Sequence, residues 1–344
     1  MPAAKPLKKL PTLADVAKRA AVSTATVSRC LNEPLRVEEA TRSRVLKAVQ
    51  DLGYSPNFGA RALAAKRTNT VGAVIPTMDN AIFARALQAF EEELNARGFT
   101  LLVASSSYDI AREAEQLRTL VARGADALLL IGFDRDAQIY DFLDGRGVPY
   151  LTAWVHDETG ARPSIGFNNK AAAQDLAQAV LALGHRQLAY ISAPCADNDR
   201  ARARVDGTRA ALLDAGIDPA TLPVIETPYS VDNGKAALKA LMKGPTPPTA
   251  VLCGNDVLAV GAVKAAKDLG LRVPQDLSIT GFDDIELANL SEPALTTVHV
   301  PHRQMGRRAA EILVQMITAD VKPNQIDPLE TYIVMRDTLA APKG

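Results

Sequence analysis

The chain has 344 residues, 47% of them hydrophobic and 23% charged, which is typical of a globular protein and excludes a disordered one. This length exceeds one ordinary hydrophobic core and fits about two or three compact units. The net charge is zero, but residues 1–69 carry 13 Lys and Arg against 5 Asp and Glu, whereas the remainder carries 26 against 34. A basic head of charge +8 on an acidic body of charge −8 indicates that the head meets a polyanion, although a solvated basic surface would give the same balance.

The sequence indicates neither membrane insertion nor metal chemistry. No apolar run approaches the roughly 18 residues of a membrane span, and the start Met-Pro-Ala-Ala-Lys-Pro lacks the apolar core of a secretory signal, so we expect a cytoplasmic protein. The cysteines Cys30, Cys195 and Cys253 form no Cys-x-x-Cys pair. The histidines are scattered without metal-ligand spacing and are interpreted as surface or core residues: His156, His185, His299 and His302. We therefore expect no disulfide framework, no metal and no cofactor.

The basic head begins with a pattern of two short helices. Thr12 and Asp15 have the spacing of a capping box, and four apolar residues then share one helical face: Leu13, Val16, Ala17 and Ala20. The pattern breaks at residues 20–22, and Ser23 can cap a second helix through Leu31 in which Val27 points inward. Two short helices with a tight turn predict a helix-turn-helix, whose second helix can enter a major groove; an ordinary helical hairpin is the alternative.

A third helix is expected over residues 37–52, with Val45, Val49 and Leu52 as its apolar stripe. Gly53 ends it, and a short helix with little apolar surface follows over residues 57–64. Such a segment is marginal alone and should fold only when it docks. We expect a headpiece over residues 1–56 and a hinge helix with its linker over residues 57–70.

From Val71 onward, short apolar runs alternate with amphipathic stretches. Expected strands span residues 71–76, 101–104, 127–131, 148–154, a short run near 165, 188–192, 224–226, 250–253 and 277–281. Expected helices span residues 83–97, 111–123, about 136–143, 171–183, 200–215, 231–242 and 257–269. This alternation predicts an α/β core of parallel sheets with helices on both faces.

These units are too many for one comfortable sheet, so we expect two similar lobes. The chain should pass between them near residues 166–169, 297–301 and 326–329. The predicted N-lobe comprises about 71–166 and 301–326, and the C-lobe about 167–298 and 327–340. Ligands bind beyond the carboxyl ends of strands in open sheets, so two facing sheets make a cleft. No phosphate-binding loop, nucleophile elbow or catalytic triad is found, and an enzyme is therefore not indicated.

Several motifs resemble the LacI/GalR family of bacterial transcriptional regulators. In the head they are Thr12-Leu13-Ala14-Asp15-Val16-Ala17, Val22-Ser23 with Thr26-Val27-Ser28-Arg29, and Leu52-Gly53-Tyr54-Ser55-Pro56-Asn57 with Ala60-Arg61 and Leu63. In the core they are Val71-Gly72, Asn80 and Phe83, Leu183-Gly184-His185, Arg204 and Gly207, Asn255-Asp256 with Ala259 and Gly261, Gly281-Phe282-Asp283-Asp284 and Leu295-Thr296-Thr297-Val298. Their order and spacing agree from about residue 12 to 340.

The resemblance implies a recognition helix that reads DNA. Thr24 and Ala25 correspond to the sequence-selecting pair, and Arg29 to a base-contacting arginine, with a phosphate clamp as its alternative. Leu63 corresponds to the hinge leucine that wedges into the minor groove; packing of the hinge is the alternative. The implied DNA-binding residues are Thr12, Ser23, Thr24, Ala25, Thr26, Ser28, Arg29, Asn32, Asn57, Arg61 and Leu63. Ala21 stands where the family often has glycine, and costs on the order of 1 kcal/mol if that turn needs a positive φ.

The resemblance also implies a periplasmic-binding-protein-like core with an effector in its cleft. Arg204, Asp283 and Asn255 correspond to polar ligand partners; solvated or turn-forming side chains are the alternative. Trp154 departs from the aspartate of some sugar-binding members and suggests stacking on the effector, with core packing as the alternative. The implied ligand-binding residues are Asn80, Phe83, Trp154, Phe167, Arg204, Tyr229, Asn255 and Asp283. Arg200 and Arg202 are placed on or near the rim, where a solvated position is as plausible.

We expect a repressor that binds a palindromic operator as a homodimer and responds to a small ligand, a sugar, sugar acid or polyol first and a nucleobase-like compound second. The sequence shows no C-terminal leucine heptads, so a coiled-coil tetramer is not expected. A pure ligand-binding protein of the same core would lack the basic head. A cytosolic sugar enzyme is the second rival.

Overall fold

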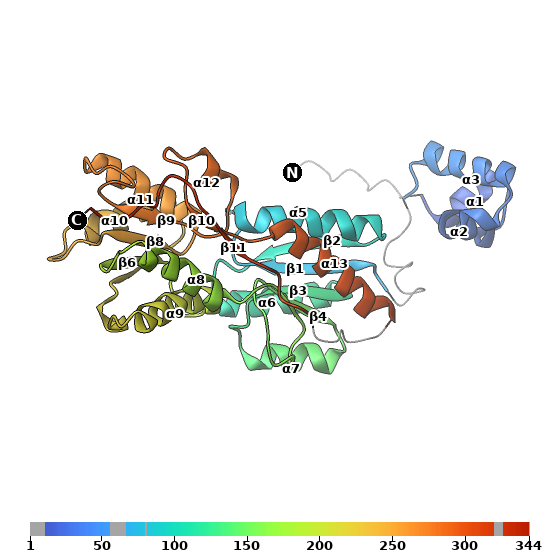
Figure 1. The fold of residues 1–344 in the computed structure, drawn as a ribbon. Coiled ribbons are helices and arrows are strands. Elements are labelled where there is room, and N and C mark those ends of the chain that lie inside the picture. The colour runs from blue at the N-terminus through green and yellow to red at the C-terminus, as the bar shows by residue number, and fades with distance from the viewer. Residues whose placement is uncertain (1–10, 56–66, 80, 320–325, 344) are drawn as a thin grey trace, which may run out of the picture. The chain divides into compact units, whose positions relative to one another are not determined.

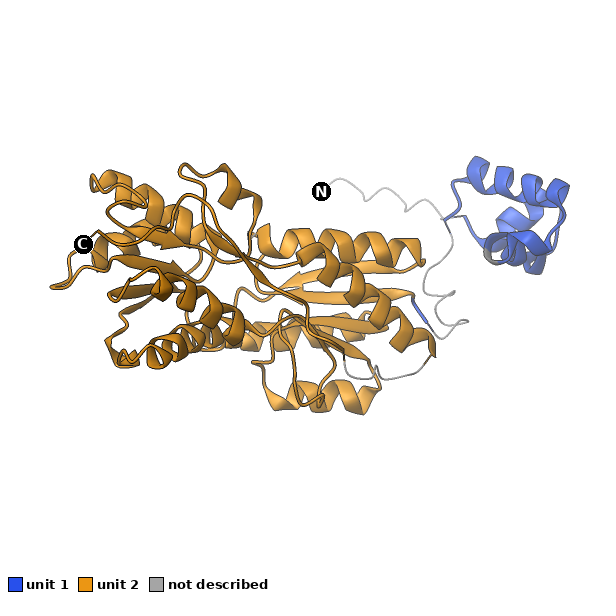
Figure 2. Ribbon diagram, in the orientation of Figure 1, with its two compact units in different colours: residues 1–68 blue, residues 69–344 orange. Residues whose placement is uncertain are grey.

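The computed structural model describes residues 11–55, 67–79, 81–319 and 326–343. The chain divides into two compact units, residues 1–68 and residues 69–344 (Figure 2). The predicted hinge helix falls outside the described residues. So do Asn57, Arg61, Leu63, Asn80 and the side chain of Asn32.

The first unit contains the predicted helix-turn-helix and a third helix. Its elements are α1 (Leu13–Ala20), α2 (Thr24–Asn32), the 3-10 turn η1 (Pro34–Arg36) and α3 (Glu39–Leu52) (Figure 1). Their shared core holds Val16, Val27, Cys30, Val45 and Ala48. The third helix begins two residues later than predicted, because the chain first forms η1. Cys30, for which the sequence suggested no role, is a core residue.

The turn between α1 and α2 contains a left-handed residue. Ala21 has φ 54° and ψ 49°, and its N–H bonds back to the carbonyls of Ala17 and Lys18. The condition stated for this turn is therefore met, since φ is positive, and an alanine carries a strain there that glycine would not.

The first sheet of the second unit has five parallel strands in the order β2-β1-β3-β4-β5. The part of the chain built on this sheet is the N-lobe. The strands are β1 (Thr70–Ile75), β2 (Thr100–Ser105), β3 (Ala127–Ile131), β4 (Tyr150–Ala153) and β5 (Ser164–Ile165). Leu129 belongs to the core under α5 (Ala81–Ala96) and α13 (His302–Ala319). Leu128 and Leu130 belong to the core under α6 (Ile110–Ala122) and α7 (Ala137–Arg146). Helices thus cover both faces, as predicted (Figure 1).

The C-lobe, built on the second sheet, repeats this plan with four parallel strands in the order β7-β6-β8-β9. They are β6 (Leu188–Ser192), β7 (Val224–Glu226), β8 (Ala250–Cys253) and β9 (Ser278–Thr280). Tyr190 packs in the core with α8 (Asn169–Ala182) and α9 (Asp199–Asp214), whereas Ala189 and Ile191 pack with α10 (Val231–Leu241) and α11 (Asp256–Asp268). Short helices η2 (Pro219–Thr221) and α12 (Glu286–Leu290) complete the lobe.

The two lobes form one compact unit because the chain passes between them repeatedly. It leaves the first sheet at β5 and enters the C-lobe with α8. It returns through β10 (Thr297–His299) to α13, which packs against α5, and then runs back through β11 (Tyr332–Val334), the antiparallel partner of β10. Beyond β11, the carbonyl of Thr338 accepts the N–H of Ile279 at 2.9 Å, so the chain ends beside the second sheet.

Some elements differ from the sequence prediction. The strand expected over residues 148–154 is only β4, since Pro149 has no N–H to donate and Trp154 has a left-handed φ of 63°. Helix α13 was not predicted as an element. Its buried Met305, Ala309 and Leu313 are nonetheless spaced four apart, a helical period that the sequence contains.

Candidate functional site

The outward face of α2 is the candidate nucleic-acid interface. Val27 and Cys30 point into the headpiece core, and the side chains of Thr24, Ala25 and Arg29 are exposed. This is the orientation that the sequence predicted for these three residues. A helix that lies in a major groove contacts base edges from its first exposed residues, so α2 presents the surface that such contact requires.

Other predicted DNA-binding residues hold the starts of the helices. Thr12 accepts the N–H of Asp15 at 3.3 Å and donates its own N–H to the Asp15 carboxylate at 2.8 Å, which is the predicted capping box. Ser23 Oγ accepts the N–H of Thr26 at 3.1 Å and lies 2.9 Å from the Thr26 hydroxyl. Ser28 is half-buried. These caps fix where α1 and α2 begin, and so fix which side chains face outward.

The second candidate site lies between the lobes, at the carboxyl ends of their strands. A cavity of about 20 Å³ there is lined by Ile82, Phe83, Tyr108, Trp154, Asn198, Arg200, Arg204, Tyr229 and Asp283. Five of these were predicted as ligand-binding residues: Phe83, Trp154, Arg204, Tyr229 and Asp283. The volume suits about one water molecule, so the lobes are closed against each other.

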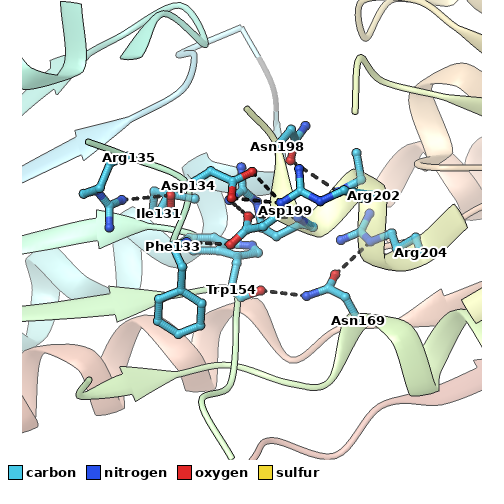
Figure 3. Close-up of polar contacts among 12 residues, drawn as sticks. Ile131, Phe133, Asp134, Arg135, Trp154, Asn169, Asn198, Asp199, Arg202 and Arg204 are labelled. Carbon is cyan, nitrogen blue, oxygen red and sulfur yellow. Dashed lines mark hydrogen bonds and ion pairs between the residues drawn. The ribbon is translucent and has the colours of Figure 1, made fainter. Parts of the chain in front are cut away.

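Arg204 on α9 is held rigidly at this cavity. Its Nε donates to Asn169 Oδ1 at 2.9 Å and its Nη1 to the carbonyl of Gly254 at 2.6 Å. The guanidinium carbon lies 3.8 Å from the centre of the Phe282 ring, within cation–π range. Asn169 in turn donates to the carbonyl of Trp154 at 2.8 Å (Figure 3). The arginine is therefore preorganised, and its remaining Nη2 is directed toward Asp283.

Asp283 is fully buried and unusually placed for a carboxylate. Arg204 Nη2 lies 3.6 Å from its Oδ1, and neither carboxylate oxygen has a hydrogen-bond partner among the described residues. Burial raises the pKa of Asp283 to about 7, against the opposing influence of Arg204. His302 Nε2 is 4.0 Å away, and burial lowers the pKa of this imidazole to about 3, so it is neutral near pH 7. The carboxylate is thus poised to accept hydrogen bonds from something that enters the cavity.

For Trp154 the sequence left two interpretations open, stacking on an effector and packing in the core, and the structure has features of both. Its side chain is buried and meets the Phe83 ring edge-on, with ring centres 5.1 Å apart. It nevertheless lines the cavity, and no described residue accepts a hydrogen bond from its Nε1. Core packing and a free polar edge at the cavity therefore occur together.

Two other predicted residues lie outside the cavity lining. Phe167 is buried and stacks on Phe282 with ring centres 6.1 Å apart, so it supports the ring beneath Arg204. Asn255 caps α11, where its Oδ1 accepts the N–H of Leu258 at 2.9 Å. Its buried Nδ2 finds no acceptor in the described part of the chain.

The structure adds residues that the sequence analysis did not assign to this site. Tyr108 follows β2 and Asn198 precedes α9, and both line the cavity with Arg200, which had been left undecided between contact and solvent. Burial raises the pKa of Tyr108, so its hydroxyl stays a donor at neutral pH. His302 was interpreted only as a surface or core histidine. The position of Tyr108 after a strand was the one available signal, since ligands bind beyond strand ends.

The described residues offer neither a metal site nor a membrane-spanning helix. Within the described ranges, no group of three or more His, Cys, Asp or Glu side chains is arranged to hold a metal ion. None of the helices in those ranges is long and apolar enough to cross a bilayer.

Comparisons with known proteins agree with this architecture. Residues 12–57 match the model of bacterial regulatory proteins of the lacI family, and residues 177–339 match that of the periplasmic binding protein-like domain. Catabolite control protein A of Priestia megaterium is 30% identical, over 95% of this chain and 98% of its own. The HTH-type transcriptional repressor PurR of Pectobacterium atrosepticum is 31% identical, over 96% and 97%. The crystal structure of the lac repressor dimer bound to operator and the anti-inducer ONPF has a TM-score of 0.85 at 29% identity, over 97% of this chain and all of that one.

A helix-turn-helix headpiece followed by a two-lobed binding-protein core, in a chain whose full-length relatives are regulators of transcription, defines a DNA-binding transcriptional regulator. The chain belongs to the LacI family of bacterial regulatory proteins.

Proposed function

We propose that the protein is a repressor that binds a palindromic operator as a homodimer and is controlled by a small effector in the interlobe cavity. The observation that carries this proposal is the outward face of α2, where Thr24, Ala25 and Arg29 are exposed above a buried core. Two copies related by a two-fold axis present two such helices, and this symmetry favours an operator of inverted half-sites.

The residues of the headpiece divide into base-reading and positioning groups. Arg29 reads a guanine, at about 1–3 kcal/mol of discrimination, Thr24 selects a neighbouring base, and Ala25 offers only a methyl contact. Backbone-positioning contacts to phosphate come from Thr12, Ser23, Thr26, Ser28 and Asn32. From the hinge segment, which lies outside the described residues, the proposed DNA contacts are those of Asn57, Arg61 and Leu63, with Leu63 as the minor-groove wedge. The proposed headpiece comprises residues 1–56, and the hinge and linker comprise residues 57–70.

The chemistry of the cavity favours a sugar, sugar acid or polyol as effector. Asp283 offers two buried carboxylate oxygens without partners, and Trp154 offers an N–H without one among the residues described. A ligand with adjacent hydroxyls donates to the first and accepts from the second, while its ring carbons pack on Trp154 and Phe83. A flat nucleobase is the second candidate because the same two aromatic rings could stack on it. Arg204, Tyr229, Phe167, Asn255 and Asn80 complete the proposed site.

The proposed control is a change in the angle between the lobes. A cavity of about 20 Å³ cannot contain a sugar, so the lobes must separate for an effector to enter. The effector then favours one lobe angle, and that angle favours or disfavours a folded hinge helix on DNA. The N-lobe of about residues 71–166 and 301–326 and the C-lobe of about 167–298 and 327–340 are the moving parts. We place the protein in the cytoplasm, where the operator is found.

Selection from a random duplex DNA library tests the operator claim. The full-length wild type should enrich a palindromic consensus, and Arg29→Ala should lose preference at one guanine in each half-site. Arg44→Ala is the matched control, since it removes one exposed charge from α3 and should weaken binding to all sequences alike. An unchanged consensus with Arg29→Ala, or no enriched sequence for the wild type, would contradict the proposal.

A further inference from the structure

An ion pair joins the two lobes beside the cavity. Arg202 on α9 belongs to the C-lobe, and Asp134 follows β3 in the N-lobe. Arg202 Nη2 donates to both carboxylate oxygens of Asp134, each at 2.9 Å, while its Nη1 donates to the carbonyl of Cys195 at 2.9 Å (Figure 3). The bond to Cys195 holds the arginine in place within its own lobe. The pair is only partly shielded from solvent, since 25% of the Asp134 side chain and 47% of the Arg202 side chain are exposed.

A second cross-lobe bond lies next to this pair. Asp199, the first residue of α9, accepts the backbone N–H of Phe133 at 2.5 Å through its Oδ2. Its other oxygen accepts from Arg200 Nη1 at 2.7 Å. The approach depends on Gly132, which has φ 71°, because a Cβ there would lie 2.5 Å from Asp199 Oδ1 and 1.8 Å from Arg200 Nη1. The N-lobe loop is therefore shaped to accept the start of α9.

Closure of the lobes also carries a cost. It leaves Trp154 Nε1 and both Asp283 oxygens buried without hydrogen-bond partners among the described residues. Each such group opposes burial, because it gives up its bonds to water and gains none from the protein. Other contacts must offset this cost if the lobes are to stay together, and the bonds from Asp134 and Phe133 to α9 are placed to do so.

We propose that Arg202, Asp134, Asp199 and the Gly132–Phe133 backbone form an interlobe clasp that holds the lobes closed without an effector. This inference rests on the proposed function and deepens it, because it assigns the stability of the closed lobes to contacts within the chain. The effector then acts on the same equilibrium between open and closed lobes as those contacts. An effector satisfies the unpaired groups around Asp283, whereas the clasp acts at the neighbouring rim. The two together set the equilibrium between open and closed lobes.

Acrylamide quenching of fluorescence tests the clasp in the effector-free, full-length protein. Trp154 is the only tryptophan, and it lies in the cavity between the lobes, so separation of the lobes exposes the emitting group directly. Asp134→Arg and Arg202→Asp each place like charges together and should raise the quenching constant several-fold, with a red shift in emission. The double variant Asp134→Arg/Arg202→Asp restores opposite charges and should return both values toward the wild type.

Matched controls separate the clasp from general effects of charge. Arg209→Asp changes the same helix, but the partner of Arg209 is Asp206 of the same lobe, so quenching should not change. Gly132→Ala obstructs the clasp without altering charge and should increase quenching; it also serves if a charge-swap variant fails to fold by circular dichroism. Single variants that quench like the wild type, or a double variant without recovery, would overturn the proposal. Operator binding, measured on the same samples, reports the headpiece separately, so the clasp can fail while the proposed function stands.

Discussion

The carboxylate of Asp283 lies 3.6 Å from the guanidinium of Arg204, and both residues are buried. The pair is too long for a hydrogen bond, and Asp283 makes none with the described residues. Burial raises the pKa of Asp283 to about 7 in spite of the arginine. The fold therefore buries a carboxylate whose ionised form is unfavourable, at a cavity where a ligand could bind it. Such a perturbed acid is typical of a functional site.

This pKa has a consequence for stability. An aspartate titrates near 3.9 when unfolded and near 7 here, so the folded protein holds the proton more tightly, and stability falls as the pH rises from about 4 through 7. Asp283→Asn removes that penalty. We expect the variant to exceed the wild type in free energy of unfolding at pH 8, with a difference that shrinks toward pH 5. Urea titrations across this range provide the check, and a difference independent of pH would contradict the assignment.

His185 should make the opposite contribution. It is buried, with Nε2 2.8 Å from the carbonyl of Ala340 and Nδ1 2.9 Å from the hydroxyl of Thr249, and burial lowers its pKa. The unfolded chain then binds the proton more tightly, so the stabilisation is complete above about pH 6.5 and is lost as the pH falls below it. His185→Gln should flatten the loss of stability between pH 6.5 and 5, at a cost of about 1–3 kcal/mol at pH 7.5. Urea unfolding at each pH measures both effects, and an unchanged slope would contradict the prediction.

The headpiece turn offers a stabilising substitution. Ala21 has φ 54°, so Ala21→Gly should relieve roughly 1 kcal/mol of backbone strain. Amide hydrogen exchange of α1 and α2 in the full-length protein should slow accordingly. Operator affinity should stay the same or increase slightly, because the outward face of α2 is untouched. Faster exchange in the variant would show that the strain is not there.

Close packing of α13 against α5 can be tested with two glycines. A Cβ at Gly306 would lie 2.0 Å from the carbonyl oxygen of Ala86, so Gly306→Ala forces these helices apart and should cost about 1–3 kcal/mol. Gly145, inside α7, has no atom within 4 Å of such a Cβ. Gly145→Ala should therefore be neutral or stabilise the protein by up to about 1 kcal/mol. Thermal unfolding of both variants checks the pair, and equal effects would refute the packing argument.

The sequence predicted the elements whose signals are local. Strand β3 was predicted with its observed bounds because an unbroken apolar run follows the glycine turn at Gly124. The caps at Thr12 and Ser23 were likewise readable from spacing. Helix α13 was not predicted, although its apolar period is present in the sequence.

The site was predictable only in part. Arg204 and Asp283 were found through family motifs, and the structure places both at one cavity. The contribution of His302 depends on the chain crossing through β10, which brings the first residue of α13 close to Asp283, and the partnership of Arg202 with Asp134 spans 68 positions. Neither contact leaves a local pattern, because both arise from how the two lobes meet.

One titration tests the central claim that a cavity ligand controls DNA binding. Trp154 emission and operator affinity should be followed together as sugars, sugar acids, polyols and nucleobases are added to the full-length protein. One compound should change both signals and saturate them at the same concentration, since both report the same binding event. A compound that binds by calorimetry yet changes neither signal, with no other compound changing both, would contradict it.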